Sequence, residues 1–307
     1  SSVYFGGGTP SLASAEAIAI ILDAVKQNPL SKEMEITFEM NPRDVSANKL
    51  SDLSALGINR YSLGVQSYND PELKGLGRNH DKASGIEATN LLKGMNSTID
   101  LIYGTEYQTA TSFQETLEQF IDSQINHLSL YQLTIEPNTI FYKKELKLPN
   151  EDQIEGMERL ARQMLESNGY QQYEVSSWSR PGFESRHNLN YWQFGDFLGL
   201  GPGAHSKITV GPEITRFRKI KPLNGYIAKQ TIADHTIIQG EELDMDLAMN
   251  LLRIKDGILP DHLGVELPKS FLKKYQLGVK EGLLLEDKIG ATARGYQYLN
   301  ETIKLFF

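Results

Sequence analysis

The sequence predicts an α/β fold, in which a parallel sheet wound with crossover helices is followed by a small, mainly helical domain. Two observations support this fold class. Strand-like segments rich in β-branched and aromatic residues alternate with amphipathic segments, and this alternation stops after residue 180. Strands joined by helices form right-handed βαβ units, so the sheet either closes into a barrel or stays open. In both cases the ligand site is expected at the carboxyl ends of the strands.

Each expected element has a local reason. The expected strands are short segments rich in β-branched and aromatic residues, with glycine or polar residues after them: Ser2–Phe5, Glu35–Met40, Arg60–Val65, Thr98–Tyr103, Leu128–Thr134 and Gln172–Ser176. The expected helices carry apolar residues at helical spacing, and Ser46 is a candidate cap for the second of them: Ala13–Val25, Asn48–Ala55, Ser112–Ile121 and Asp152–Ser167.

The change of pattern predicts three parts. Residues 1–209 form the first domain, whose irregular extension over 180–205 is rich in glycine, asparagine and aromatic residues. Residues 210–243, which begin with Gly211-Pro212 and several basic residues, are expected to be a connector. Residues 244–307 contain short helical patterns and a terminal Gly282–Leu285 segment, which together resemble a small winged-helix module.

Composition excludes several classes of function. A net charge of −8 argues against an extended nucleic-acid surface, and no apolar run approaches the ~20 residues that span a bilayer. The amino-terminal residues lack the pattern of a signal peptide, so a cytoplasmic location is expected. The chain has no cysteine, which excludes disulfides and thiolate-bound zinc or iron–sulfur sites; no metal site is predicted from these residues.

The run Tyr4-Phe5-Gly6-Gly7-Gly8-Thr9-Pro10-Ser11 predicts a strand that enters a glycine-rich turn. Because glycine has no Cβ and tolerates positive φ, the backbone of such a turn can approach a small polar ligand closely. A plain connection between a strand and a helix is the structural alternative for this run alone.

Polar residues also stand at the ends of the following strands. Glu39, Gln66 and Asp100 interrupt apolar strand sequences, and Arg78 supplies a planar cation suited to a carboxylate. Each of them could instead bond to neighbouring backbone or, for Arg78, form a surface ion pair. Strand ends that repeatedly deliver ligand-capable groups to one edge favour a binding site there.

These motifs, in this order, resemble the radical S-adenosylmethionine family of oxygen-independent coproporphyrinogen III oxidases, which includes haem chaperones. The resemblance rests on the following segments: Gly6-Gly7-Gly8-Thr9-Pro10, Glu39-Met40-Asn41-Pro42, Gly64-Val65-Gln66-Ser67, Gly77-Arg78, Ile99-Asp100-Leu101-Ile102-Tyr103-Gly104 and Arg186-His187-Asn188-Leu189-Asn190-Tyr191-Trp192. It implies a partial (β/α) barrel that binds S-adenosylmethionine across its strand ends. By the same resemblance Gly7, Gly8 and Thr9 would line the methionyl amine and carboxylate, Glu39 and Arg78 would contact the methionyl group, and Gln66 and Asp100 would bind the ribose.

The sequence departs from this family in one decisive respect. Members hold a 4Fe–4S cluster through a C-x-x-x-C-x-x-C loop that precedes the glycine run, and neither this loop nor the first strand is present in these residues. The chain as written is therefore expected to be inactive in reductive cleavage of S-adenosylmethionine. No catalytic residue is assigned, and whether the protein is an enzyme stays open. Ser185 stands where relatives often have a further cysteine.

The run His187-Asn188-x-x-Tyr191-Trp192 distinguishes subfamilies within this resemblance. A histidine is a natural axial ligand of haem iron, and the aromatic residues could face a porphyrin. The structural alternative is that these residues close the open side of the barrel.

Two functions follow from the resemblance. The first is a haem chaperone that binds haem and S-adenosylmethionine and delivers haem to acceptor proteins, which could include proteins at the membrane surface. The second is an oxygen-independent coproporphyrinogen III oxidase, which decarboxylates propionate side chains by radical chemistry. The His187 run favours the chaperone. The acceptor and the oligomeric state are not predicted.

Overall fold

The computed structural model describes residues 1–27, 33–137, 139, 141–228 and 231–307. These residues form two compact units, Ser1–His187 and Asn188–Phe307. The division differs from the boundary expected near Val210. The expected boundary does not hold because the strands before and after position 210 pair with each other in one antiparallel sheet of the second unit.

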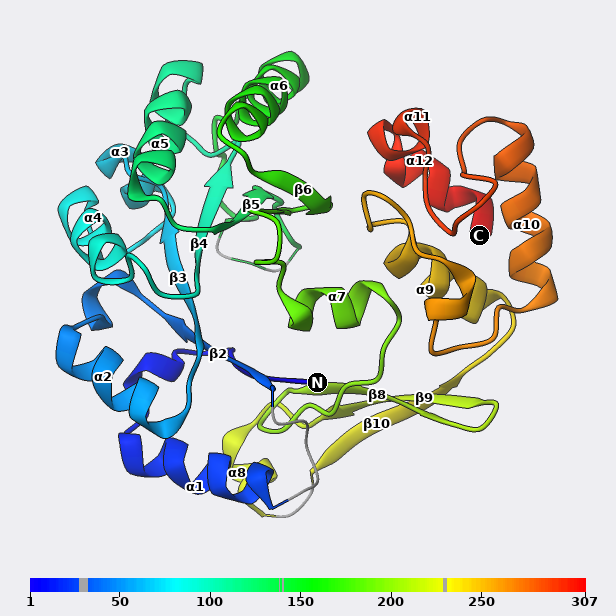
Figure 1. Ribbon diagram of the computed structural model, residues 1–307, viewed down its shortest axis with the longest axis horizontal. Helices are drawn as coiled ribbons and strands as arrows, with labels where there is room; N and C mark the ends of the chain where they lie inside the picture. The colour runs from blue at the N-terminus through cyan, green and yellow to red at the C-terminus, as the bar shows by residue number, and fades with distance from the viewer. Residues whose placement is uncertain (28–32, 138, 140, 229–230) are drawn as a thin grey trace. The chain divides into compact units, whose positions relative to one another are not determined.

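The first unit contains a seven-stranded sheet with the strand order β1-β2-β3-β4-β5-β7-β6. The first five strands are parallel neighbours in chain order: β1 (Ser2–Phe5), β2 (Glu35–Met40), β3 (Arg60–Gln66), β4 (Ser97–Tyr103) and β5 (His127–Gln132). The expected strand near Gln172 is split into β6 (Gln171–Glu174) and β7 (Ser177–Ser179), which pair antiparallel. The predicted α/β class with a partial barrel is confirmed: the parallel strands form a curled half-barrel (Figure 1).

Six helices lie along the outer face of this sheet (Figure 1). They are α1 (Ala15–Lys26), α2 (Ala47–Leu56), α3 (Asp70–Gly75), α4 (Lys82–Leu91), α5 (Ala110–Ser123) and α6 (Glu151–Ser167). Short 3₁₀ turns, η1 (Pro10–Leu12) and η2 (Pro42–Asp44), follow β1 and β2. The Ser46 side chain accepts a hydrogen bond from the Lys49 N–H, so the expected cap of α2 is present.

The two faces of the sheet differ because side chains alternate along each strand. Apolar residues such as Phe38, Leu63 and Leu101 point toward the helices and are fully buried in the core. The residues between them are largely polar: Glu35, Thr37, Glu39, Arg60, Ser62, Thr98, Asp100, His127 and Ser129. One face of the sheet is therefore a hydrophobic core, and the other is a polar surface that can contact a ligand.

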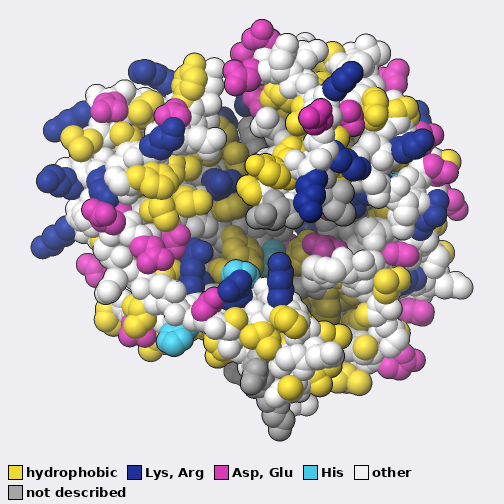
Figure 2. All heavy atoms as spheres, turned by 180° about the vertical axis from the view of Figure 1, so that it is seen from behind, with side chains coloured by type: hydrophobic (Ala, Val, Ile, Leu, Met, Phe, Trp, Pro, Cys, Tyr) yellow, Lys and Arg dark blue, Asp and Glu magenta, His cyan; other side chains and the backbone are white. Residues whose placement is uncertain are grey.

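The second unit joins a three-stranded antiparallel sheet to a set of helices. The sheet has the order β10-β9-β8, from β8 (His205–Val210), β9 (Glu213–Lys219) and β10 (Ile232–Ile238). The segment expected to be a connector therefore contains β9, β10 and α8 (Leu223–Ile227), although residues 229–230 lie outside the described part. On the face shown in Figure 2, apolar side chains are interspersed with charged ones.

The carboxyl-terminal part is helical, as predicted. Its elements are α9 (Glu241–Leu251), η3 (Pro260–His262), α10 (Lys269–Lys280), α11 (Ala293–Gln297), α12 (Leu299–Ile303) and η4 (Lys304–Phe306). The terminal segment that includes Leu284 forms only an isolated β-bridge to Ala291. Among the described residues, no helix is both long enough and apolar enough to cross a membrane. The remaining helix, α7 (Arg186–Trp192), starts at the end of the first unit.

Candidate functional site

The glycine-rich turn after β1 brings backbone close to the end of β2. A Cβ on Gly6 would lie 2.6 Å from Tyr4 Cε1 and 2.9 Å from Glu39 Oε1, so a side chain at this position would displace both groups. Gly7 and Gly8 have φ of 77° and 61°, in the left-handed region, and both face open space. Thr9 is exposed just before η1. The turn therefore needs glycine for close approach at one position and for backbone conformation at two.

Glu39 joins this turn to β1 and β2. Its Oε2 accepts a hydrogen bond from the Gly7 N–H at 3.1 Å, and its Oε1 accepts one from the Tyr4 hydroxyl at 2.8 Å. Burial raises the pKa of Tyr4, and the charges of Glu39 and Asp100 raise it further, so Tyr4 remains a neutral donor. The Glu39 carboxylate is thus oriented by two donors and stays partly accessible.

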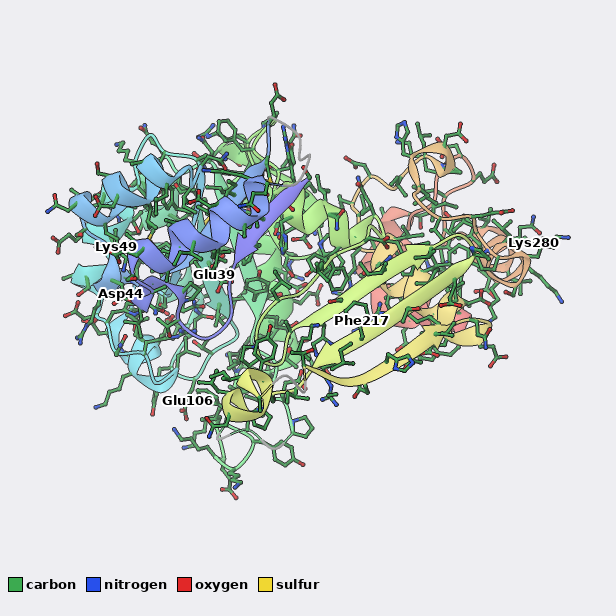
Figure 3. The ribbon with its side chains drawn as sticks, turned by 90° about the horizontal axis from the view of Figure 1, so that it is seen from below. Glu39, Asp44, Lys49, Glu106, Phe217 and Lys280 are labelled. Carbon is green, nitrogen blue, oxygen red and sulfur yellow. The ribbon has the colours of Figure 1, made fainter. Side chains whose placement is uncertain are left out.

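The 3₁₀ turn η1 is anchored beside this carboxylate. The Ser11 hydroxyl donates to Asp44 Oδ2 at 2.5 Å, and Lys49 Nζ donates to the Ser11 carbonyl. Figure 3 labels Glu39, Asp44 and Lys49 on neighbouring parts of the first unit. These bonds fix the far end of the glycine turn to η2 and α2.

Asp100 lies on β4, on the same polar face of the sheet as Glu39. The Ser62 hydroxyl donates to its Oδ2 at 2.7 Å, and Asp100 lies opposite Ser129 in the β4–β5 register. Burial raises the pKa of Asp100 to about 6; the hydrogen bonds from Ser62 and Ser129 oppose this rise, and the charge of Glu39 adds to it. The charge of Glu39 therefore acts on the carboxyl group of Asp100, and both groups lie on the polar face of the sheet.

Gln66 and Arg78 lie at the end of β3 and after α3. Gln66 has φ of 70°, and the β3–β4 register is irregular between Leu63 and Gln66, which places Gln66 opposite Leu101. Arg78 is exposed, yet partial burial lowers its pKa while the Asp100 charge raises it. The guanidinium of Arg78 is therefore close enough to Asp100 for the two charges to interact.

The structure thus brings the sequence-predicted residues to the same edge of one sheet. Gly7 and Glu39 are in contact, Asp100 interacts electrostatically with Glu39 and Arg78, and Gln66 lies on the strand next to that of Asp100. Chemically, such a set offers two carboxylates for an ammonium group or hydroxyls, a cation for a carboxylate, and an amide.

Several residues of this polar face were missed in the sequence. Tyr4 and Ser62 contact Glu39 and Asp100 directly, and Glu35 and Arg60 form a buried ion pair with 3.7 Å between Arg60 Nη1 and Glu35 Oε2. The signal that could have identified them is the two-residue period of the strands. Glu35 and Glu39 are four positions apart on one strand and so lie on one face, as do the other polar residues at even spacing.

His187 lies at the start of α7 and contacts two of these residues. Its ring stacks on that of Tyr4, with centroids 4.3 Å apart and an angle of 19° between the planes. Its backbone N–H donates to Glu35 Oε1 at 3.0 Å, and the N–H of Arg186 donates to Glu35 Oε2 at 3.1 Å. Burial lowers the pKa of His187 to about 4, although the charge of Glu35 opposes this, so the imidazole is neutral at neutral pH.

The other residues of the His187 run belong to the second unit. Tyr191 packs against Phe197 with ring centroids 4.5 Å apart, and the Arg253 guanidinium lies 5.2 Å from the Trp192 ring centroid. The buried Trp192 Nε1 has no hydrogen-bond partner among the described residues. Asn188 is partly buried on the same helix. Tyr191 and Trp192 therefore each pack against another side chain of the second unit.

The residues present do not fit an iron–sulfur cluster. The 307 residues contain no cysteine, and the described part of the chain brings no three of His, Cys, Asp and Glu together as a metal-binding group. These residues therefore supply no thiolate to a cluster of the kind described for radical enzymes.

Comparisons with known proteins agree with the motifs. The Radical SAM superfamily matches residues 1–120. The heme chaperone HemW of Haemophilus influenzae is 38% identical over 317 residues, covering 99% of this chain and 82% of that protein. The heme chaperone HemW of Escherichia coli is 34% identical over 323 residues, with 99% and 83% covered.

The fold is also found in a solved structure. Coproporphyrinogen III oxidase (HemN) from Escherichia coli, a radical SAM enzyme, superimposes with a TM-score of 0.77 and covers 99% of this chain and 77% of its own. At a sequence identity of 22%, this superposition shows a shared fold and no more. Taken with the nearly full-length similarity to HemW proteins, this places the chain in the radical SAM family of oxygen-independent coproporphyrinogen III oxidases and related haem chaperones, in its HemW branch.

Proposed function

We propose that this protein is a haem chaperone of the HemW type, which binds S-adenosylmethionine and haem and delivers haem to acceptor proteins. The observation that carries the proposal is the similarity to HemW proteins over 99% of the chain, which includes the His187 run as well as the strand-end motifs. The likeness to HemN, at 22% identity, shows the fold alone, so the oxidase alternative is the less well supported of the two.

The strand-end residues have the chemistry that S-adenosylmethionine requires. Glu39, already oriented by Gly7 and Tyr4, would accept the methionyl ammonium, and Arg78 would bind the methionyl carboxylate. Asp100 and Gln66 would bind the ribose hydroxyls. The backbone of Gly7, Gly8 and Thr9 would line the methionyl group, since no Cβ fills the space in front of the two glycines.

His187 would provide or support the axial haem ligand. Its neutral imidazole can offer a nitrogen lone pair to iron, and its ring plane and backbone are both held by contacts in the first unit. Tyr191, Trp192 and Asn188 would add contacts to the porphyrin rather than a bond to iron.

Haem titration of the 307-residue chain tests this proposal. Wild-type protein is expected to give a stoichiometric Soret band, and His187→Ala should shift its position, because a change of axial ligand changes the electronic state of the iron. His235→Ala is the matched control, since His235 is exposed on β10. If His187→Ala lowers the melting temperature but leaves the haem spectrum unchanged, the ligand assignment is wrong. Turnover of coproporphyrinogen III by a protein that also contains the cluster loop would favour the oxidase alternative.

A further inference from the structure

His187 is held from two sides within the first unit. The backbone at the start of α7 bonds to Glu35, and the imidazole ring stacks on Tyr4. Neither contact belongs to the strand-end set proposed for S-adenosylmethionine. The two contacts fix different things, because a backbone bond places the Cα atom whereas a stacked ring limits the rotation of the side chain.

The Glu35 carboxylate is itself immobilised. Only 8% of the residue is exposed, and its partner Arg60 is 2% exposed. The guanidinium of Arg60 is in turn held by the Thr98 hydroxyl at 3.0 Å and by the Asn96 side chain and the Phe183 carbonyl, both at 3.2 Å. A buried carboxylate persists only where charge and hydrogen bonds compensate its desolvation. Both Glu35 oxygens accept N–H groups of α7, so the start of this helix is tied to the interior of the barrel.

Tyr4 connects His187 to the other candidate site. One face of its ring stacks on the imidazole, while its hydroxyl donates to Glu39. Such a stacked aromatic pair contributes a favourable interaction beyond the area that it buries. A continuous series of contacts therefore runs from the buried Arg60 through Glu35 and His187 to Tyr4 and Glu39.

We propose that Glu35 and Tyr4 are positioning residues for His187, Glu35 by fixing the start of α7 and Tyr4 by setting the plane of the imidazole. This inference rests on the proposed function, because the position of His187 can affect haem binding only if His187 contacts haem. Neither residue is expected to touch iron. Their loss should weaken haem binding without changing which atom coordinates the metal.

The first experiment measures the position of the ring without haem. Protons above a stacked aromatic ring resonate upfield, and the His187 signals can be identified among the six histidines by their loss in His187→Ala. We expect Tyr4→Leu to move these signals downfield and Tyr4→Phe to leave them nearly in place, since phenylalanine keeps the ring. Phe5→Leu is the matched control: its ring packs on Phe38, at 5.7 Å between centroids, on the opposite face of β1.

The second experiment tests Glu35 by amide hydrogen exchange. Glu35→Gln keeps one carbonyl oxygen but loses the other acceptor and the charge, so exchange at Arg186 and His187 should become faster. The control is Glu33→Gln, which removes the same charge from an exposed neighbouring side chain. Equal exchange rates at both amides in Glu35→Gln and wild type would refute the role of Glu35.

Haem affinity then separates this inference from the proposed function. Tyr4→Leu should weaken haem binding roughly three- to tenfold, Tyr4→Phe should restore it, and Phe5→Leu should not weaken it. If His187→Ala leaves the haem spectrum unchanged while Tyr4→Leu still moves the His187 signals, the haem assignment fails and the positioning role stands. If the His187 signals stay in place in Tyr4→Leu, the positioning role of Tyr4 is wrong, whatever haem does.

Discussion

Replacement of Asp100 by asparagine should stabilise the protein at neutral pH and leave it nearly unchanged in acid. The carboxyl group has its pKa raised from 3.8 to about 6 because burial disfavours its charged form. The folded chain therefore binds a proton more tightly at this position than the unfolded chain does. As pH rises from about 4 to about 6, the free energy of unfolding falls, since the unfolded state releases its proton first.

The size of the effect follows from this difference. One pKa unit corresponds to about 1.36 kcal/mol, so ionised Asp100 costs the folded state about 2–3 kcal/mol at pH 7.5 and about 0.5 kcal/mol at pH 4.0. Asparagine avoids this cost because it does not ionise. Its side-chain oxygen can still accept the hydrogen bond that the Ser62 hydroxyl donates to Asp100.

Urea unfolding of the first unit measures this prediction. The chain has two tryptophans, so a Trp192→Phe background leaves buried Trp178 as the fluorescent reporter of the first unit. The difference in unfolding free energy between Asp100→Asn and its parent should be about 2–3 kcal/mol at pH 7.5 and should shrink to about 0.5 kcal/mol at pH 4.0. Asp52→Asn, on an exposed face of α2, is the control. An Asp100→Asn variant that is less stable at pH 7.5, or whose gain is the same at both pH values, would refute the reasoning.

Two further predictions concern stability. Gly6→Ala should cost about 1–3 kcal/mol, because its Cβ would press on Tyr4 and Glu39, whereas Gly7→Ala, which faces open space at φ of 77°, should cost only about 1 kcal/mol of backbone strain. Equal losses in urea unfolding would contradict this distinction. Glu72→Ala should cost about 2–4 kcal/mol, with Glu72→Gln losing less, because the fully buried carboxylate accepts three hydrogen bonds. Its donors are Ser67 (2.7 Å), Gln108 (2.9 Å) and Ser112 (2.6 Å). A thermal shift below 1 °C in Glu72→Ala would show that these donors find other partners.

Much of the first unit could be predicted from the sequence because its signals are local. The strands β1 to β5 are rich in β-branched and aromatic residues and are followed by glycine or polar residues, and α2 begins where Ser46 can cap it. Parallel strands end at one edge of a sheet, so Glu39, Gln66 and Asp100 were expected to gather there. The boundary near Val210 was misplaced because a hairpin turn at Gly211 has the same composition as a linker.

The residues that were missed act through contacts between distant segments. Arg186 and His187 bond to Glu35 across about 150 positions of sequence, and a charged residue at the start of a strand is typical of an exposed end. Only the assembled sheet shows that Glu35 is buried against Arg60. No local pattern distinguishes such a carboxylate from a solvated one.

The loss of folding stability caused by ionised Asp100 is itself evidence about the role of this residue. A carboxylate that lowers stability at neutral pH has no advantage for folding over the isosteric amide, and polar groups held at such a cost are typical of functional sites. The neighbouring Glu39 adds to the cost, while the nearby Arg78 is left exposed. A ligand that carries hydroxyl donors and a positive charge would relieve both carboxylates at once. The same charges that lower the stability of the folded chain would therefore favour a sulfonium ligand with a ribose and an ammonium group. If the proposed function is right, Asp100→Asn should bind S-adenosylmethionine roughly tenfold more weakly in calorimetry while being the more stable protein.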